Sequence, residues 1–281
     1  MGLENFNVLI RDKKGIPFKT IDYPQFGTTV RKAKSIRIED ILKLNPTIID
    51  TNVTYYQPDE FENIMHSLSK CKRAQSLPLD HINNYIIYLE NLLNTFAIHN
   101  VIFVDGVNNE INDAFNSIKD HYKRINKVYN REYWDSDKES KLNLEILLKL
   151  KTQMSKLVAL VHQRDIVNQL DNAQMKIFMD VFDFLIKYSD KIKKPLKRKR
   201  NGKLKIDYRA DENIVAGAIA YAFKRKVNII SNDKDVTGLL KFYYEEYKKR
   251  EEVDLKLPNL SINVFAESGL EDEVYRLIRI F

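Results

Sequence analysis

The stretch "PTIIDTNVTYY", Pro46–Tyr56, decides the fold of this chain. Residues suited to a buried strand lead directly into a charged side chain, Asp50, and the small polar pair Thr51 and Asn52 follows. An aspartate in this position is typical of a helix N-cap, and it is also typical of a ligand site at the end of a strand. The rest of the chain bears on this choice.

The composition is that of a globular protein. The 281 residues are 44% hydrophobic and 30% charged, which is enough for one large α/β domain or two small ones. Only 8 residues are glycine, and neither G-x-G-x-x-G nor G-x-x-x-x-G-K occurs. A glycine-rich loop that cradles the phosphates of a nucleotide is therefore excluded.

The charge balance and the cysteine count limit the partners. The net charge of +7 favours anionic partners, either nucleic acid or an acidic membrane surface. The single cysteine excludes a disulfide framework and a thiolate zinc site, and the five histidines show no paired ligand spacing. Because no apolar run reaches about 18 residues, we expect a soluble, cytoplasmic protein without a membrane segment. A homo-oligomer is left open.

Strand-like and helix-like segments alternate along the chain. Strands are expected at 47–50, 100–105, 227–231 and 261–265, and helical spacing of apolar residues separates them. This alternation predicts an α/β fold with a mostly parallel sheet flanked by helices. We expect an N-terminal β-rich extension over 1–45, with two short strands in 6–22, and a main domain over 46–281.

Acidic residues follow the predicted strands. Asp50 and Asp233 come after two of them, and Glu110 and Asp211 lie at the starts of helices. The carboxyl ends of parallel strands meet at one edge of a sheet, so these side chains are expected to converge. Clustered carboxylates repel one another unless a cation or proton offsets them, and Mg²⁺ or Mn²⁺ is the usual partner. Such ions activate water for attack on a phosphodiester.

The order of these motifs resembles that of the PIN domain, a family of metal-dependent ribonucleases on a small α/β sheet. The resemblance covers about 46–112 and 204–266. The matching motifs are Asp50-Thr51-Asn52 after a strand, Glu110 after the second strand, Asp211 with Ala218 on a helix, and Ser231-Asn232-Asp233.

The resemblance implies a ribonuclease that hydrolyses RNA with Mg²⁺ or Mn²⁺. The implied catalytic residues and metal ligands are Asp50, Glu110, Asp211 and Asp233, with Asp235 as a fifth ligand and Thr51, Asn52 and Ser231 as supporting residues. Asp105 and Asp113 compete with Glu110 for its position. The gap from Glu110 to Asp211 exceeds the usual spacing of the family, which predicts a helical insertion over about 115–200.

A basic run, Lys191–Lys205, has nine Lys or Arg residues in fifteen positions and no acid. Pro195 and Asn201-Gly202 favour turns, so we expect an exposed loop. The loop is either a solvated linker or a contact for the phosphates of RNA, with single-stranded DNA as a further candidate. The residues proposed to bind nucleic acid are Lys194, Lys197, Arg198, Lys199 and Arg200.

Three other interpretations stay open. Asp50 and Asp211 each suit a plain helix N-cap. A separate alternative is a catalytically silent RNA-binding or scaffold protein that keeps the fold without cleaving. A haloacid-dehalogenase-like phosphatase requires a second acid where this chain has Asn52, which cannot donate and recover a proton. Asp207 and Glu212 are expected to be solvent-exposed charges rather than ligands.

Overall fold

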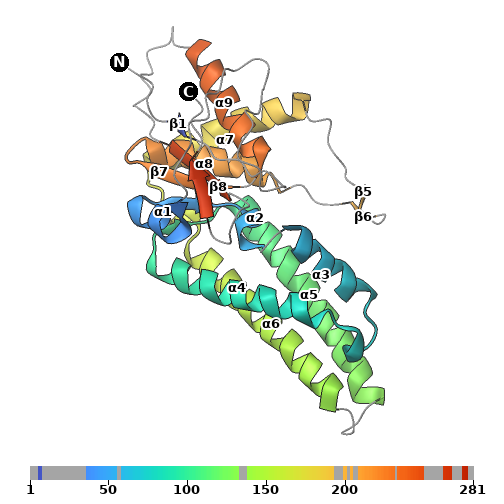
Figure 1. Cartoon of the computed structure of the whole chain (residues 1–281). Helices are drawn as coiled ribbons and strands as arrows, with labels where there is room; N and C mark the ends of the chain where they lie inside the picture. The colour runs from blue at the N-terminus through green and yellow to red at the C-terminus, as the bar shows by residue number, and fades with distance from the viewer. Residues whose placement is uncertain are drawn as a thin grey trace. The chain divides into compact units, whose positions relative to one another are not determined.

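The structure is a computed structural model that describes residues 6–7, 36–55, 58–132, 138–192, 199–200, 203–204, 208–231, 233–249, 262–267 and 274–277 (Figure 1). The chain forms two compact units. The first comprises Met1–Asp50, His99–Val107 and Arg164–Phe281, and the second comprises Thr51–Ile98 and Asn108–Gln163.

The first unit is built on a sheet with a parallel centre. Strand β3 (Thr47–Ile49) pairs in parallel with β4 (Val101–Ile102) and with β7 (Val227–Ile230), and β7 pairs in parallel with β8 (Ile262–Glu267). The predicted α/β class with a mainly parallel sheet is therefore confirmed. The four strands follow from short apolar runs, whose members alternate between two buried faces.

An antiparallel edge extends this sheet. Strand β9 (Val274–Leu277) pairs with β8, and β2 (Ile36–Arg37) pairs with β9, both antiparallel. The strand predicted at 261–265 is confirmed as β8, but it is not the last strand, because β9 follows it. Strand β1 (Phe6–Asn7) pairs in parallel with β8. The remainder of the predicted hairpin at 6–22, and most of the predicted extension over 1–45, lies outside the described residues.

Helix α8 (Ala210–Ala222) is the central helix of the first unit. It contacts β3, β7 and β8, and it also packs against α7 (Asn172–Ile192) and α9 (Lys234–Lys249). All its residues from Glu212 to Ala222 are buried, and the small Ala and Gly residues among them let neighbouring elements approach closely. A Cβ on Gly217 would lie 2.5 Å from Cδ1 of Ile166, so a larger residue there would require the Ile166 side chain to shift.

Two smaller helices complete the first unit. Helix α1 (Ile38–Leu44) precedes β3, and the 3-10 helix η2 (Ile166–Asn168) follows a parallel bridge between Phe103 and Asp165. Helical spacing of apolar residues predicts a helix over about 140–170, but α6 (Lys138–Gln163) ends earlier. The chain then starts η2, and Asp165 is the N-cap of η2, since its carboxylate accepts a hydrogen bond of 2.9 Å from the backbone N–H of Val167.

The second unit is helical in its described residues. It contains α2 (Thr51–Thr54), α3 (Pro58–Lys70), η1 (Ala74–Ser76), α4 (Leu79–Ile98), α6 (Lys138–Gln163) and most of α5 (Asp105–Glu132). Figure 1 shows α4 and α6 side by side, in agreement with their contacts. Buried aliphatic residues at helical spacing form this core, among them Ile82, Leu89, Leu147, Leu150 and Leu157.

The boundary between the units differs from that of the predicted insertion at about 115–200. Helix α7 falls within the predicted insertion, yet it belongs to the first unit and packs on α8. Helices α3 and α4 precede the predicted insertion, yet they belong to the second unit. The insertion was inferred from sequence spacing alone, which gives no information on which helices share a core.

The basic run contains regular structure. Strands β5 (Lys199–Arg200) and β6 (Lys203–Leu204) pair in antiparallel register, with Arg200 opposite Lys203. The expectation of a loop throughout Lys191–Lys205 is therefore wrong for these four residues, and also for Lys191 and Ile192, which belong to α7. Asn-Gly is the preferred sequence of a two-residue hairpin connection, and Asn201-Gly202 separates the two strands.

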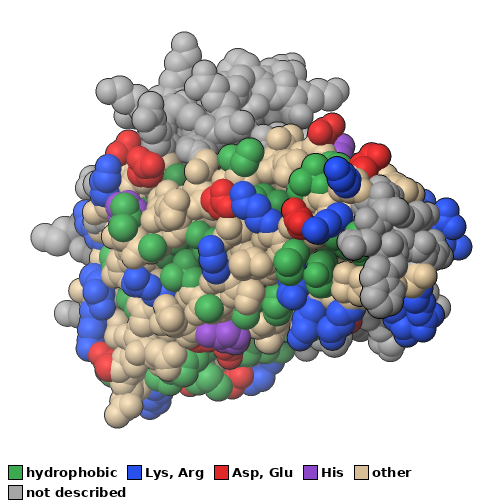
Figure 2. Space-filling model, turned by 90° about the horizontal axis from the view of Figure 1, so that it is seen from below, with side chains coloured by type: hydrophobic (Ala, Val, Ile, Leu, Met, Phe, Trp, Pro, Cys, Tyr) green, Lys and Arg blue, Asp and Glu red, His purple; other side chains and the backbone are tan. Residues whose placement is uncertain are grey.

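Charge is distributed unevenly between the units. The second unit holds thirteen basic and thirteen acidic residues, so the net charge of +7 comes entirely from the first unit. On the face that Figure 2 shows, Lys and Arg side chains lie in several separate places with acidic side chains among them. Within the described ranges, no helix combines the length and the apolar character needed to cross a bilayer.

Candidate acidic site at the carboxyl edge of the sheet

Asp50 and Ser231 meet at the carboxyl ends of two neighbouring strands. Asp50 follows β3 and is only 3% exposed, and Ser231 follows β7. The strands are in register, with Ile49 opposite Ile230. The Ser231 hydroxyl donates a hydrogen bond of 2.6 Å to Oδ2 of Asp50. A buried carboxylate requires such donors, because burial without them is costly.

Asp233 continues this chain of contacts. Its backbone N–H donates a hydrogen bond of 3.0 Å to the Ser231 hydroxyl, and its Oδ1 accepts one of 2.8 Å from the N–H of Asp235. Asp233 therefore serves as the N-cap of α9, which begins at Lys234. Asp235 is exposed in the first turn of this helix. Asn232 lies outside the described residues.

Asp211 lies on the same edge for a topological reason. It is in the first turn of α8, and α8 leads into β7. A crossover helix runs antiparallel to the parallel strands it connects, so its N-terminus lies at their carboxyl edge. Gly106, just beyond β4, supports this placement: a Cβ there would lie 2.5 Å from Cα of Ala210. Asp50, Asp211 and Asp233 thus share one edge of the first unit.

Glu212 was expected to be a solvent charge, and this prediction is wrong. Its side chain is 4% exposed and forms an ion pair of 3.6 Å with Nη1 of Arg209. The error arose because α8 is buried on all sides, a property that the helical period of the sequence does not reveal. Asp207 lies outside the described residues.

The remaining predicted acid, Glu110, belongs to the second unit. It is half-buried on α5, and its backbone carbonyl accepts a hydrogen bond of 3.4 Å from the Tyr55 hydroxyl. Of its two competitors, Asp113 is exposed in the same unit, whereas Asp105 is exposed at the first position of α5 and belongs to the first unit. Asp105 is therefore the candidate that shares a unit with Asp50, Asp211 and Asp233.

The two supporting residues after Asp50 also belong to the second unit. Asn52 is half-buried, and Thr51 is 2% exposed. The Thr51 hydroxyl has no hydrogen-bond partner among the described residues. A buried polar atom without a partner costs about 1–3 kcal/mol, so Thr51 is suited to a partner from outside the protein.

Tyrosines hold the short helix that contains Thr51. The Tyr85 hydroxyl donates a hydrogen bond of 3.1 Å to the carbonyl of Thr54, and the Tyr88 hydroxyl donates one to the carbonyl of Val53. Burial raises the pKa of Tyr85 well above its ordinary value, so its hydroxyl keeps its proton for this bond. The sequence analysis missed both tyrosines, because their role depends on tertiary packing.

The donor atoms at the edge are of the right type for Mg²⁺ or Mn²⁺, which prefer carboxylate and hydroxyl oxygens. These side chains do not, however, form a complete metal site. In the part of the chain that the structure describes, no three His, Cys, Asp or Glu side chains form a group that could hold one ion. The ligand set Asp50, Glu110, Asp211, Asp233 and Asp235 therefore stays a prediction.

The proposed nucleic-acid contacts are described only in part. Lys199 and Arg200 form β5, whereas Lys194, Lys197 and Arg198 lie outside the described residues. The likeness to PIN domains rests on the motifs quoted above. The whole chain matches no family model, no curated protein and no solved structure.

Proposed function

We propose that the chain is a divalent-metal-dependent ribonuclease whose acidic site lies at the carboxyl edge of the sheet. The observation that carries this proposal is the position of Asp50. It is a buried carboxylate at the end of a central parallel strand, tied to Ser231 of the next strand at 2.6 Å. This edge is where open α/β sheets bind their ligands.

Each residue has a distinct part in the proposal. Asp50, Asp211 and Asp233 would hold Mg²⁺ or Mn²⁺, with Asp235 as a further ligand, and the Ser231 hydroxyl orients the Asp50 carboxylate. The ion, when bound, supplies an activated water for attack on phosphorus. The resemblance assigns Glu110 to the same set, and Asp105 is its competitor within the first unit.

The charge of the first unit fits an RNA substrate. All of the net positive charge resides in this unit, which also contains the basic run. Lys and Arg residues bind nucleic acid chiefly through phosphates, and this contact requires no particular base sequence. Single-stranded DNA is the second substrate to test.

Asp50→Asn and Asp211→Asn test this function. Both remove a charge and keep the size of the side chain, so cleavage of labelled RNA in Mn²⁺ should fall by orders of magnitude while circular dichroism stays unchanged. Asp180→Asn is the matched control, because Asp180 is exposed on α7 in the same unit. Cleavage by purified protein that persists in excess chelator would contradict the metal mechanism.

A silent RNA-binding scaffold is the second candidate. The observation that favours it is that two of the acids already have structural partners: Asp50 accepts from Ser231, and Asp233 caps α9. This candidate predicts RNA binding without cleavage in Mg²⁺ or Mn²⁺. It also predicts that Asp50→Asn lowers the melting temperature and that added metal does not change it.

A further inference from the structure

Helix α7 has two stripes of mainly apolar side chains. The inner stripe consists of the buried residues Gln174, Phe178, Val181 and Leu185. It attaches α7 to α8, since the two helices pack together and the Nε2 of Gln174 donates a hydrogen bond of 3.2 Å to the carbonyl of Ala220. The outer stripe consists of Met175, Met179, Phe182 and Ile186, which recur at helical spacing about a quarter turn further round α7.

The outer stripe is partly exposed. Met179 is 49% exposed, and the other three side chains are half-buried. Phe182 is also fixed in place, because its ring stacks on that of the buried Phe178 with 5.9 Å between the ring centroids. A rigid row of large apolar side chains that stays exposed is typical of a protein–protein contact, whereas a core stripe is buried like the inner one.

Two exposed charges lie beside the outer stripe. Lys176 and Asp183 are one heptad apart in sequence, so they share one side of α7, next to the outer stripe. Neither side chain forms an ion pair within the described part of the chain. Both charges are therefore open to a partner, and their opposite signs make this surface complementary to a reversed copy of itself.

Two copies of α7 fit together when they run antiparallel about a two-fold axis. Met179 of one copy then lies opposite Phe182 of the other, and Met175 lies opposite Ile186. Each contact occurs twice, because a two-fold interface uses the same patch on both copies. The spacing of the outer stripe, four then three then four residues, is that of the a and d positions of a coiled-coil seam.

The same register pairs the charges. Lys176 of each copy lies opposite Asp183 of the other, as residues beside an antiparallel seam do. A parallel pair in register would instead place Lys176 level with Lys176 of the second copy, so like charges would meet. The charges therefore favour the antiparallel arrangement of two identical copies.

We propose that the outer stripe is a homodimer interface, in which α7 of one copy packs antiparallel to α7 of a second copy. The proposal does not depend on the proposed function. The outer stripe is about 17 Å long at 1.5 Å per residue, which is short for the interface of an obligate dimer. The dimer should therefore form in a concentration-dependent manner.

Sedimentation velocity of the full chain over a concentration series tests the interface. Wild type should shift from monomer to dimer with rising concentration. Met179→Glu places a charge at the centre of the contact and should abolish the dimer, while its melting temperature stays close to that of the wild-type monomer because Met179 is exposed. The matched control is Val167→Glu, since Val167 is 46% exposed in the same unit, and this variant should dimerise like wild type.

A charge exchange tests the register. Lys176→Glu and Asp183→Lys each place like charges opposite one another at two points of the dimer, so each should weaken dimerisation by roughly 10-fold. The double variant exchanges the signs and should restore the dimer. Asp180→Lys with Lys187→Glu is the matched control, because both residues are exposed on α7 away from the outer stripe, and it should dimerise like wild type.

Three results would overturn the proposal. Wild type that stays monomeric at every concentration would show that the outer stripe is covered by another part of the chain or by a different protein. A dimer that Met179→Glu leaves intact would place the interface on another surface. A double variant that stays as weak as the single variants would show that Lys176 and Asp183 do not face each other, because only two copies of the same sequence restore the pair when both signs are exchanged.

Discussion

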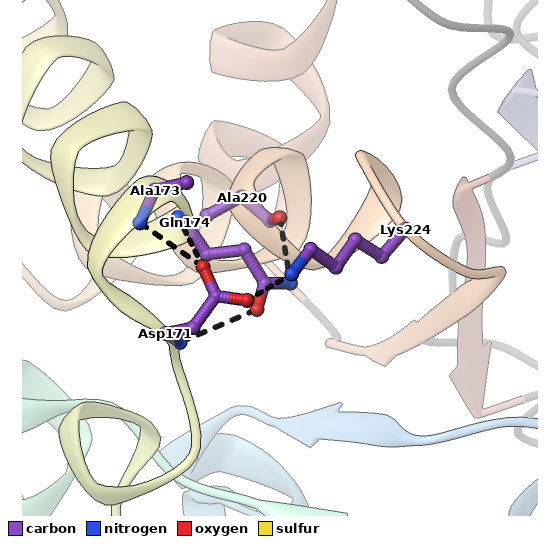
Figure 3. Close-up of polar contacts among 5 residues, drawn as sticks. All are labelled: Asp171, Ala173, Gln174, Ala220 and Lys224. Atoms are coloured by element: carbon purple, nitrogen blue, oxygen red, sulfur yellow. Dashed lines mark hydrogen bonds and ion pairs between the residues drawn. The ribbon is translucent and has the colours of Figure 1, made fainter.

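Lys224 and Asp171 form an ion pair that joins the end of α8 to the start of α7 (Figure 3). The Asp171 carboxylate also caps α7, accepting hydrogen bonds of 3.0 Å from the N–H groups of Ala173 and Gln174. In return, the Oε1 of Gln174 accepts a hydrogen bond of 3.4 Å from the backbone N–H of Asp171. The Nε2 of Gln174 donates a hydrogen bond of 3.2 Å to the carbonyl of Ala220. One capping box therefore both starts α7 and attaches it to α8.

The first prediction concerns acid stability. The hydrogen bond from the Lys224 ammonium holds the pKa of Asp171 below its ordinary value of 3.8. Its contribution to stability is therefore complete above that value and is lost as pH falls through the lowered pKa. Asp171→Asn keeps a capping side chain but cannot titrate, so its melting temperature should change less between about pH 2 and pH 5.

Asp180→Asn is the control for this titration, because Asp180 is exposed on α7 away from the cap. It should keep the wild-type dependence on pH. The difference between wild type and Asp171→Asn should also shrink in high salt, since the pair is partly exposed. Identical pH profiles for wild type and Asp171→Asn would contradict the assigned cause.

The second prediction separates the two roles of Asp233, the cap of α9 and the metal ligand. Asn caps a helix about as well as Asp, so Asp233→Asn should melt at the wild-type temperature or higher without metal. Mn²⁺ should raise the melting temperature of wild type in proportion to the logarithm of its concentration above Kd, and Asp233→Asn should lose most of this gain.

Asp233→Ala completes this comparison. Loss of the cap should cost about 1 kcal/mol of unfolding free energy whether or not metal is present. Calorimetric scans over a Mn²⁺ series measure both effects. If Mn²⁺ does not change the wild-type melting temperature and Asp233→Asn is destabilised, the acidic residues at this edge are structural and do not bind metal.

The central strands were predictable because each is an apolar run that ends in polar residues. The register of β3 and β7 then brings Asp50 and Ser231 together, as expected for one edge of a parallel sheet. Strand β9 (Val274–Leu277) was missed because Arg276 interrupts its apolar residues, so they form no continuous apolar run. The hairpin in the basic run was missed although Asn201-Gly202 is its sequence signal.

The details of the acidic site were less predictable than the sheet. The left-handed backbone of Arg209 has no sequence signature, because only glycine and asparagine indicate positive φ. The burial of Glu212 depends on α8 being enclosed on all sides by tertiary contacts. Sequence spacing alone could not decide between Asp105 and Glu110, because the unit to which each belongs is set by packing.

The third prediction concerns a buried polar network in the sheet. Asn228 is completely buried in β7, where its Nδ2 donates a hydrogen bond of 3.0 Å to the carbonyl of Ile41. Its Oδ1 accepts bonds from the Nδ2 groups of Asn263 at 2.9 Å and Asn45 at 3.4 Å. Asn228→Leu should cost about 1–3 kcal/mol in urea unfolding, because it removes the donor to the buried carbonyl of Ile41.

Asn228→Asp provides the sharper test of this network. It keeps the shape but places a carboxyl group where an amide donates to the carbonyl of Ile41, and none of these three hydrogen-bond partners is a cation. Burial favours the neutral form, so this variant should be less stable than wild type at pH 7 and should recover part of the loss as pH falls. Stability equal to wild type at every pH would show that the network contributes nothing.

The last prediction concerns the basic run. Each phosphate that a lysine or arginine neutralises releases condensed counterions, so for a single strand log affinity falls against log salt by roughly 0.7 per contact. If the run supplies about three to five contacts, neutralising four of its charges should flatten this slope by about 2 to 3 units. The variant is the quadruple Gln substitution of Lys197, Arg198, Lys199 and Arg200. Affinity should fall similarly for unrelated sequences, because phosphate contacts do not read bases.

The control neutralises four exposed lysines of the second unit, Lys70, Lys127, Lys141 and Lys156. This control lowers the net charge by the same amount as the quadruple variant. A difference between the two therefore reports the position of the neutralised residues and not the total charge. The β5–β6 hairpin holds the backbone of Lys199 and Arg200 in regular structure, and both lie in the unit that carries the net positive charge. Binding is measured by salt titration in Ca²⁺ or with Asp211→Asn, which prevents cleavage. If both variants flatten the slope equally, the effect belongs to net charge; if neither does, RNA is bound by another surface and the basic run is a solvated segment.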